Sequence, residues 1–149
     1  MNRVVVTGIG MVTPLAYKTE DTWQRLIEGK SGINRIKSFD TDDLNVKIAG
    51  QIPGVDESYG FNPDNHLEKK DQRKVDDFII YAMAAADQAI EDSGWEAKSE
   101  EDLYKAGVLV GSGIGGLQSI GDTANLIKEK GPRRVSPFLA SGRYSWAIT

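Results

Sequence analysis

Residues 72–92 have the apolar periodicity of one long helix, and this pattern constrains the fold more than any other feature of the sequence. Alanine occupies positions 82, 84, 85, 86 and 89, so a neighbouring element can approach this helix closely. We therefore predict a central, largely buried helix that ends at Ser93-Gly94. The apolar residues recur three or four positions apart: Val75, Phe78, Ile79, Ala82, Met83, Ala86, Ala89 and Ile90.

Two short apolar runs, Arg3–Thr7 and Val108–Val110, are each followed by a glycine-rich loop and are typical of buried strands. A third strand is expected within residues 46–52, in an otherwise irregular stretch over residues 33–66. Further helices are expected from about residue 20 to 27, with Thr19 as the N-cap, and over residues 117–130. Strands that alternate with helices predict an α/β fold.

The loop Gly111–Gly116 matches the G-x-G-x-x-G pattern of dinucleotide-binding proteins and raises a nucleotide-binding alternative. Such proteins place an acidic residue at the end of a second strand roughly 20 residues further on. This chain has the basic segment 128–134 in that region, and neither glycine loop contains the lysine of a P-loop. The sequence favours a different reason for the glycines, namely a tight turn from a strand into a closely packed helix.

Composition excludes several other classes of protein. The 149 residues carry a net charge of −4, which argues against general nucleic-acid binding. No apolar run approaches the roughly 20 residues of a membrane span, and no signal peptide is evident, so we expect a cytoplasmic protein. The absence of cysteine rules out disulfides, thiolate zinc sites and thiol nucleophiles within this sequence. The single histidine, His66, lies in a polar segment, so we predict no metal site and no cofactor.

Five sequence blocks, in order and in register, resemble the type II β-ketoacyl-acyl-carrier-protein synthases (3-oxoacyl-ACP synthases), the condensing enzymes of fatty-acid synthesis. Position 114 of the glycine loop is isoleucine, which resembles the type II enzymes. The type I enzymes typically have glycine at this position. The blocks are Arg3–Leu15, Gly29–Ile33 with Phe39-Asp40, Asp71–Phe78, Gly111–Leu117 and Gly131–Phe138.

The resemblance implies the N-terminal portion of a thiolase-like fold, in which two α/β halves pack together and the enzyme is a homodimer. It also implies chain elongation by decarboxylative condensation with malonyl-ACP, through one cysteine and two histidines. Because those groups are missing, we expect the chain to be the front part of such an enzyme, cut before its nucleophile and inactive alone. We assign no catalytic residue. Residues 1–138 are interpreted as a partial ketosynthase domain and residues 139–149 as a divergent tail.

The resemblance also assigns candidate binding residues for an acidic acyl carrier protein and for an acyl chain. The carrier-docking candidates are Lys70, Arg73 and Lys74 near the start of the long helix, with Arg133 and Arg134 as a second basic point. The alternative for these basic residues is a solvated helix surface. Ile114 and Phe138 are the candidates for the acyl pocket.

Two further functions stay open besides the truncated enzyme: a non-catalytic module that binds carrier protein, and the nucleotide-binding α/β domain. In the resembling fold, the central helix and the strand edges are covered by sequence that this chain lacks. We therefore expect self-association or marginal stability. No nucleic-acid or membrane partner is expected.

Overall fold

The computed structural model describes residues 3–135, and these residues form two compact units. The first unit contains residues up to Asn62 together with Met83–Trp95. The second unit contains Pro63–Ala82 and the residues from Glu96 onward. The long helix α3 (Asp77–Ser93) contributes its first turns to the second unit and its remaining turns to the first.

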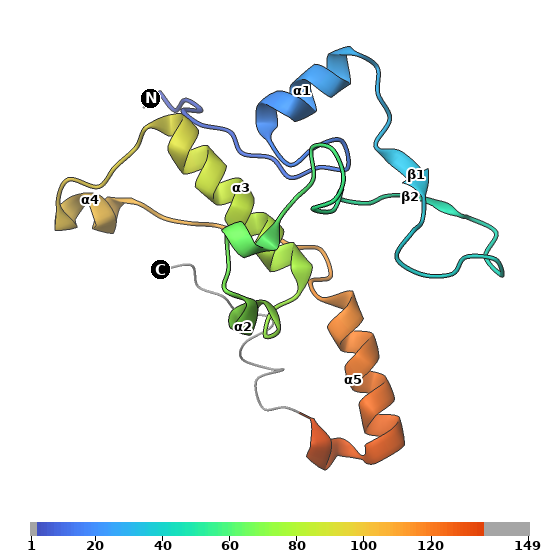
Figure 1. The fold of residues 1–149 in the computed structure, drawn as a ribbon. Helices are drawn as coiled ribbons and strands as arrows, with labels where there is room; N and C mark the ends of the chain where they lie inside the picture. Colours follow the sequence, from blue (N-terminus) through green and yellow to red (C-terminus); the bar gives the residue numbers. More distant parts are fainter. Residues whose placement is uncertain (1–2, 136–149) are drawn as a thin grey trace. The chain divides into compact units, whose positions relative to one another are not determined.

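The first unit contains helix α1 (Thr19–Ile27) and a pair of short antiparallel strands, β1 (Ile33–Arg35) and β2 (Ile48–Gly50), besides its share of α3 (Figure 1). In the register of the pair, Asn34 lies opposite Ala49. Strand β2 confirms the centre of the strand predicted within residues 46–52. Its partner β1 lies in a stretch for which the sequence predicted irregular structure.

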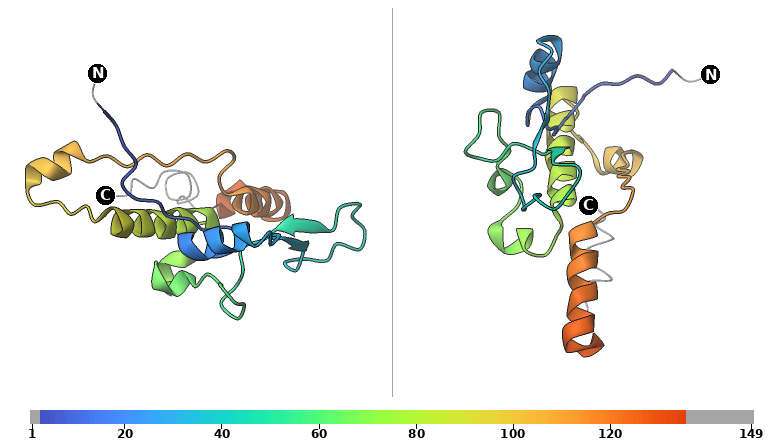
Figure 2. Two further views of the ribbon diagram at one scale, coloured as in Figure 1. Left: turned by 90° about the horizontal axis from the view of Figure 1, so that it is seen from above. Right: turned by 90° about the vertical axis from the view of Figure 1, so that its right-hand side faces the viewer.

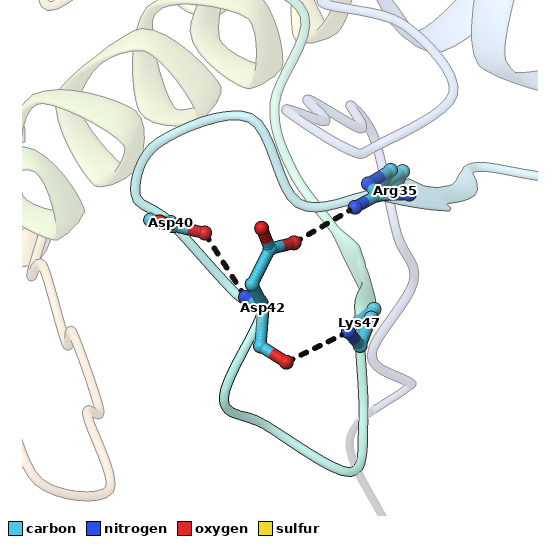
Figure 3. A network of polar contacts seen from close by, with 4 residues as sticks. All are labelled: Arg35, Asp40, Asp42 and Lys47. Carbon is cyan, nitrogen blue, oxygen red and sulfur yellow. Dashed lines mark hydrogen bonds and ion pairs between the residues drawn. The ribbon is translucent and has the colours of Figure 1, made fainter.

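The loop between β1 and β2 is organised around Asp42 (Figure 3). Its carboxylate accepts from the Arg35 guanidinium at 3.5 Å, and its backbone N–H donates to the Asp40 carboxylate at 3.0 Å. The Lys47 ammonium donates to the Asp42 carbonyl oxygen at 2.9 Å. The ion-paired side chains are exposed, so each contact contributes at most about 1 kcal/mol and mainly shapes the loop.

The N-terminal segment packs directly on the backbone of α3 within the first unit (Figures 1 and 2). A Cβ atom at Gly8 would overlap the carbonyl oxygen of Ala89, and one at Gly10 would overlap that of Ala85. Glycine, which has no Cβ, permits this close approach of the segment to the helix backbone at Ala85 and Ala89. The prediction that the alanines of this helix allow close approach is therefore confirmed.

Polar contacts fix the same segment along α3. The amide nitrogen of Gln88 donates to the carbonyl oxygens of Met11 at 3.1 Å and Tyr17 at 3.0 Å. Its amide oxygen accepts from the backbone N–H of Thr19 at 3.3 Å. The Asp92 carboxylate accepts from the Ile9 N–H at 2.9 Å. One face of the helix thus satisfies backbone groups of a segment that has no regular secondary structure of its own.

The second unit is built from short helices and loops. The turn η1 (Pro63–Asn65) precedes helix α2 (Lys69–Gln72), and α4 (Glu100–Lys105) follows α3 in the chain. Helix α5 (Leu117–Lys130) begins directly after the glycine loop and ends at Gly131, whose φ of 79° suits glycine. The turn η2 (Pro132–Arg134) comes next. Helix α5 agrees with the predicted range 117–130.

The helix predicted over residues 72–92 is wrong at its start, because the structure has two helices there. The N–H groups of Lys74 and Val75 bond to carbonyl oxygens three residues back, which tightens the chain and ends α2. Val75 is then buried, and α3 begins at Asp77. The N-cap prediction for Thr19 is also wrong: Lys18 is the N-cap, and the Thr19 hydroxyl donates to the Ile9 carbonyl oxygen at 3.2 Å.

The strands predicted at Arg3–Thr7 and Val108–Val110 are not β-strands in the structure, and β1 with β2 is the one sheet among residues 3–135. Both runs are exposed rather than buried, with Val4 at 91% and Leu109 at 98% exposure. A strand needs backbone partners on a neighbouring strand, and no described residue pairs with either run in a sheet. Apolar sequence alone therefore does not make these runs strands. Within residues 3–135, no helix combines the length and apolarity needed to cross a membrane.

Candidate functional site

The three basic candidates Lys70, Arg73 and Lys74 lie on α2 and the turn that follows it, not on the long helix itself. Lys70 is within α2, Arg73 occupies its C-cap position in a helical conformation, and Lys74 follows. All three residues are exposed. Lys70, Arg73 and Lys74 therefore keep the i, i+3 and i+4 spacing of neighbours on one helical turn. The helix that carries them is α2, which is shorter than the predicted helix.

The three side chains differ in their electrostatic surroundings. The Lys70 ammonium lies 2.6 Å from the Glu68 carboxylate, and the Lys74 ammonium lies 2.5 Å from the Asp71 carboxylate. The hydrogen bond from Lys74 is the main reason why the pKa of Asp71 is lowered. Arg73 has no hydrogen bond or ion pair with any residue that the structure describes. Of the three cations, Arg73 is thus the one that the described part of the chain leaves unpaired.

Arg73 borders an open hollow of about 350 Å³ in the second unit. Lys69, Gln72 and Asp77 contribute its other polar groups, and Pro63 and Ile80 complete it. The Lys69 ammonium lies 3.2 Å from Asp64, and the Gln72 amide donates to the same carboxylate at 2.9 Å. These two contacts, that of Gln72 foremost, lower the pKa of Asp64. An acidic group that approached this hollow would therefore meet the Arg73 guanidinium, which has no partner within residues 3–135, beside a lysine that is already neutralised.

Arg133 and Arg134 lie in η2, and both residues are exposed. Figures 1 and 2 show η2 beyond the C-terminal end of α5 and apart from α2. The two basic segments are therefore separate points on the second unit rather than one continuous patch. A role of these arginines in docking stays a prediction.

The glycine loop carries the acyl-pocket candidate Ile114, which is 69% exposed. Side chains at Gly111 and Gly113 would meet nothing within 4 Å, and Gly115 has a φ of 77°, which favours glycine. The second acyl-pocket candidate, Phe138, lies outside the described residues. The function of both residues stays a prediction.

The C-terminal end of the glycine loop is held by Asp76, a residue that sequence reasoning did not single out. The Ser119 hydroxyl, in the first turn of α5, donates to Oδ1 of Asp76. The other carboxylate oxygen is buried, has no hydrogen-bond partner among the described residues, and occupies the space that a Cβ at Gly116 would need. The contact spans 43 residues of sequence, and no local pattern reports it.

An open hollow of about 270 Å³ adjoins this contact. Its lining is Val75, Asp76, Asp77, Phe78, Gly115, Gly116, Leu117 and Gln118. Through its contacts with Ser119 and Gly116, the Asp76 carboxylate already lies against the N-terminal end of α5. Unpaired N–H groups and the helix dipole favour a negative charge at this end of a helix. Within the described part of the chain, no group of three or more His, Cys, Asp or Glu side chains is arranged to hold a metal ion.

Comparison with known proteins places this arrangement in a family. The family model described as "Beta-ketoacyl synthase, N-terminal domain" matches residues 1–148. This chain belongs to the beta-ketoacyl synthase family. The match includes most of residues 139–149, for which the sequence alone showed no resemblance.

Two curated relatives narrow the comparison. The chain is 53% identical over 144 residues to the 3-oxoacyl-[acyl-carrier-protein] synthase 2 of Rhizobium meliloti (strain 1021), covering 96% of this chain and 34% of the relative. It is 46% identical over 136 residues to the protein of the same name from Vibrio cholerae serotype O1, covering 91% of this chain and 31% of the relative. The chain thus spans about a third of the length of the curated relatives that it matches.

A solved structure agrees with the sequence relatives. The ishigamide ketosynthase/chain length factor superposes with a TM-score of 0.68 at 26% identity, covering 91% of this chain and 32% of that one. The predicted fold class is therefore confirmed: the chain is the N-terminal portion of the thiolase-like fold, represented among the described residues by helices and one small sheet.

Proposed function

We propose that this chain is the N-terminal part of a 3-oxoacyl-ACP synthase of type II, which elongates fatty acyl chains by decarboxylative condensation with malonyl-ACP. The observation that carries the proposal is the 53% identity to a synthase of this kind over 96% of the chain. The remaining two thirds of such an enzyme supply the nucleophilic cysteine and the two histidines, because this sequence has no cysteine and one histidine. A cytoplasmic location and a homodimeric parent enzyme belong to the same proposal.

In this proposal the chain's own contribution is binding rather than covalent chemistry. The segment around α2 receives the acidic acyl carrier protein, with Arg73 as the main cation because it has no charged partner among residues 3–135, and Arg133 and Arg134 form a second point. Ile114 and Phe138 line the acyl pocket. Without a thiol, the chain alone forms no acyl-enzyme. The exposed apolar runs at residues 3–7 and 108–110 lead us to expect self-association when the chain is alone.

The nucleotide-binding alternative has less physical support. A phosphate at the N-terminal end of α5 would compete with the Asp76 carboxylate, which is already packed against Gly116 and Ser119. Like charges at one such site repel each other. The non-catalytic carrier-binding module remains a second candidate, since it uses the same basic residues and needs no nucleophile.

A chimeric synthase distinguishes the enzyme from the module. The matched part of this chain replaces the corresponding third of the Rhizobium meliloti synthase 2, and elongation of acyl-ACP with malonyl-ACP is measured. The proposal predicts activity well above that of the same chimera with its nucleophilic cysteine changed to serine. A folded chimera that binds carrier protein but is no more active than this control would contradict the proposal and favour the module.

A further inference from the structure

The position of the glycine loop depends on few contacts. Four of its six residues are glycines, at positions 111, 113, 115 and 116, and these have no side chains to anchor it. Within the loop, the Ser112 hydroxyl accepts from the Gly115 N–H at 3.1 Å, which shapes the turn but ties it to no other element. What fixes the loop to the rest of the second unit is therefore found at its C-terminal end.

Asp76 provides that fixed point. It lies directly before α3, so its backbone belongs to the start of one helix, and its Oδ1 accepts from Ser119 in the first turn of another. Ser119 is 4% exposed, so the bond is shielded from water. Asp76 Oδ2 lies against Gly116, where any side chain would overlap it. One carboxylate thus couples the start of α3, the first turn of α5 and the last residue of the loop.

The charge of the carboxylate suits this place as well. It lies at the N-terminal end of α5, where the helix dipole and the unpaired N–H groups stabilise a negative charge. A hydrogen bond from a hydroxyl to an ionised carboxylate is stronger than one between neutral groups. The contact is therefore able to restrain the backbone at Gly115 and Gly116, immediately after Ile114.

We propose that Asp76 is a positioning residue that, through Ser119 and Gly116, sets the place of Ile114 and thereby the acyl-chain preference of the synthase. The inference rests on the proposed function, because Ile114 lines an acyl pocket only in that proposal. It adds a residue that is distant from Ile114 in the sequence and that acts through backbone position, without contact to the acyl chain.

The first arm of the test uses the full chain and hydrogen exchange of the backbone amides. In Ser119→Ala, exchange over residues 115–121 is expected to rise by about tenfold, the change that loss of one charge-assisted hydrogen bond produces. Asp76→Ala should have a similar effect, and the two substitutions together should add little. Ser119→Thr keeps the hydroxyl and should restore slow exchange. Asp43→Ala, at an exposed carboxylate of the first unit, is the control and should leave this segment unchanged.

The geometry at Gly116 gives a second, independent check on the same chain. Gly116→Ala should destabilise the protein less in the Asp76→Ala background than alone, because the overlapping oxygen is then absent. If Asp76→Ala does not fold, Ser119→Ala by itself decides the first arm. A folded Ser119→Ala variant with unchanged exchange over residues 115–121 would overturn the proposal.

The second arm uses the chimeric synthase and compares kcat/KM for a long and a short acyl-ACP. Ser119→Ala is expected to change the ratio of the two values about three- to tenfold, with Ser119→Thr restoring it and Asp43→Ala leaving it unchanged. A purely structural role would lower both values together, and a constant ratio in an active chimera would overturn this inference alone. An inactive parent chimera would instead overturn the proposed function, and this inference with it.

Discussion

The two glycine-bearing segments of this chain have similar sequences but opposite surroundings. In the first unit, Gly8 and Gly10 lie against the backbone of α3, and side chains from that helix bond to the segment that contains them. In the second unit, Gly111 and Gly113 have open space where a side chain would be, and Ile114 between the glycines is largely exposed. In the first segment, the glycines allow close contact with the backbone of α3. In the second segment, Gly111 and Gly113 make no comparable contact.

This difference shows why a glycine motif alone does not indicate a ligand site. The formal G-x-G-x-x-G pattern of residues 111–116 contains one glycine, Gly116, whose missing side chain makes room for a protein carboxylate. The same absence of a Cβ that lets a phosphate approach a backbone lets Asp76 approach it. The neighbours of each glycine, rather than the motif, decide its function.

The largest expected effect comes from adding one methyl group to the contact segment. Gly10→Ala places a Cβ on the carbonyl oxygen of Ala85 and should destabilise the protein by about 1–3 kcal/mol, the typical cost of overpacking. The matched control is Gly113→Ala, where the new methyl group meets nothing, and its effect should stay within about 0.5 kcal/mol. Urea denaturation followed by circular dichroism measures both. Equal effects of the two substitutions would remove the contrast between the segments.

A smaller effect is expected on the binding of an acidic acyl carrier protein. Arg73→Glu should weaken binding at low salt more than Lys74→Glu, because Lys74 is already paired with Asp71 whereas Arg73 has no partner among the described residues. Each exposed ion pair contributes about 0.2–1 kcal/mol, so the dissociation constant should rise up to about fivefold. Titration calorimetry or fluorescence anisotropy at two salt concentrations measures the dissociation constant of the complex with the carrier protein.

The matched control for that experiment lies in the first unit. Arg35→Glu reverses another exposed cation, whose partner is Asp42, and it should leave carrier binding unchanged (Figure 3). If Arg35→Glu weakens binding as much as Arg73→Glu, the effect is one of net charge and the basic residues are only a solvated surface. Salt should weaken the specific part, because the Debye length is about 8 Å at physiological ionic strength.

The smallest expected effect is a pH dependence of the first unit at alkaline pH. Burial raises the pKa of Tyr17, and the carboxylates of Asp87 and Glu91 raise it further. A pKa that is higher in the folded protein means that the neutral phenol stabilises the fold below the unfolded pKa of about 10 and that this stability is lost as the pH rises through the folded pKa. Tyr17→Phe should therefore reduce the loss of stability above pH 10, by less than about 0.5 kcal/mol. Tyr104→Phe, at an exposed ring, is the control, and an identical alkaline slope for Tyr17→Phe and the original chain would contradict the assignment.

Local sequence patterns predicted α1, α3 and α5 better than the rest of the fold, whereas α4 and the separate helix α2 were not predicted. The apolar spacing around Ala85 and Ala89 located α3, and Gly131 marked the end of α5, because both signals lie within one helix or at its end. The strand predictions at residues 3–7 and 108–110 were wrong, because strand formation depends on partners that an apolar run does not specify. The Asp76–Ser119 contact was missed for the same reason: its two groups are far apart in the sequence.

Hydrogen exchange of the full chain tests the contrast between the two segments most directly. Backbone N–H groups between Ile9 and Thr19 donate to Asp92, to Gln88 and within their own turn, so we expect them to exchange at least about tenfold more slowly than those of Val108–Ile114. Gln88→Ala should remove much of that protection and leave Val108–Ile114 unchanged. Equal exchange rates in the two segments of the original chain would show that the contacts with α3 do not hold the first segment more firmly than the second.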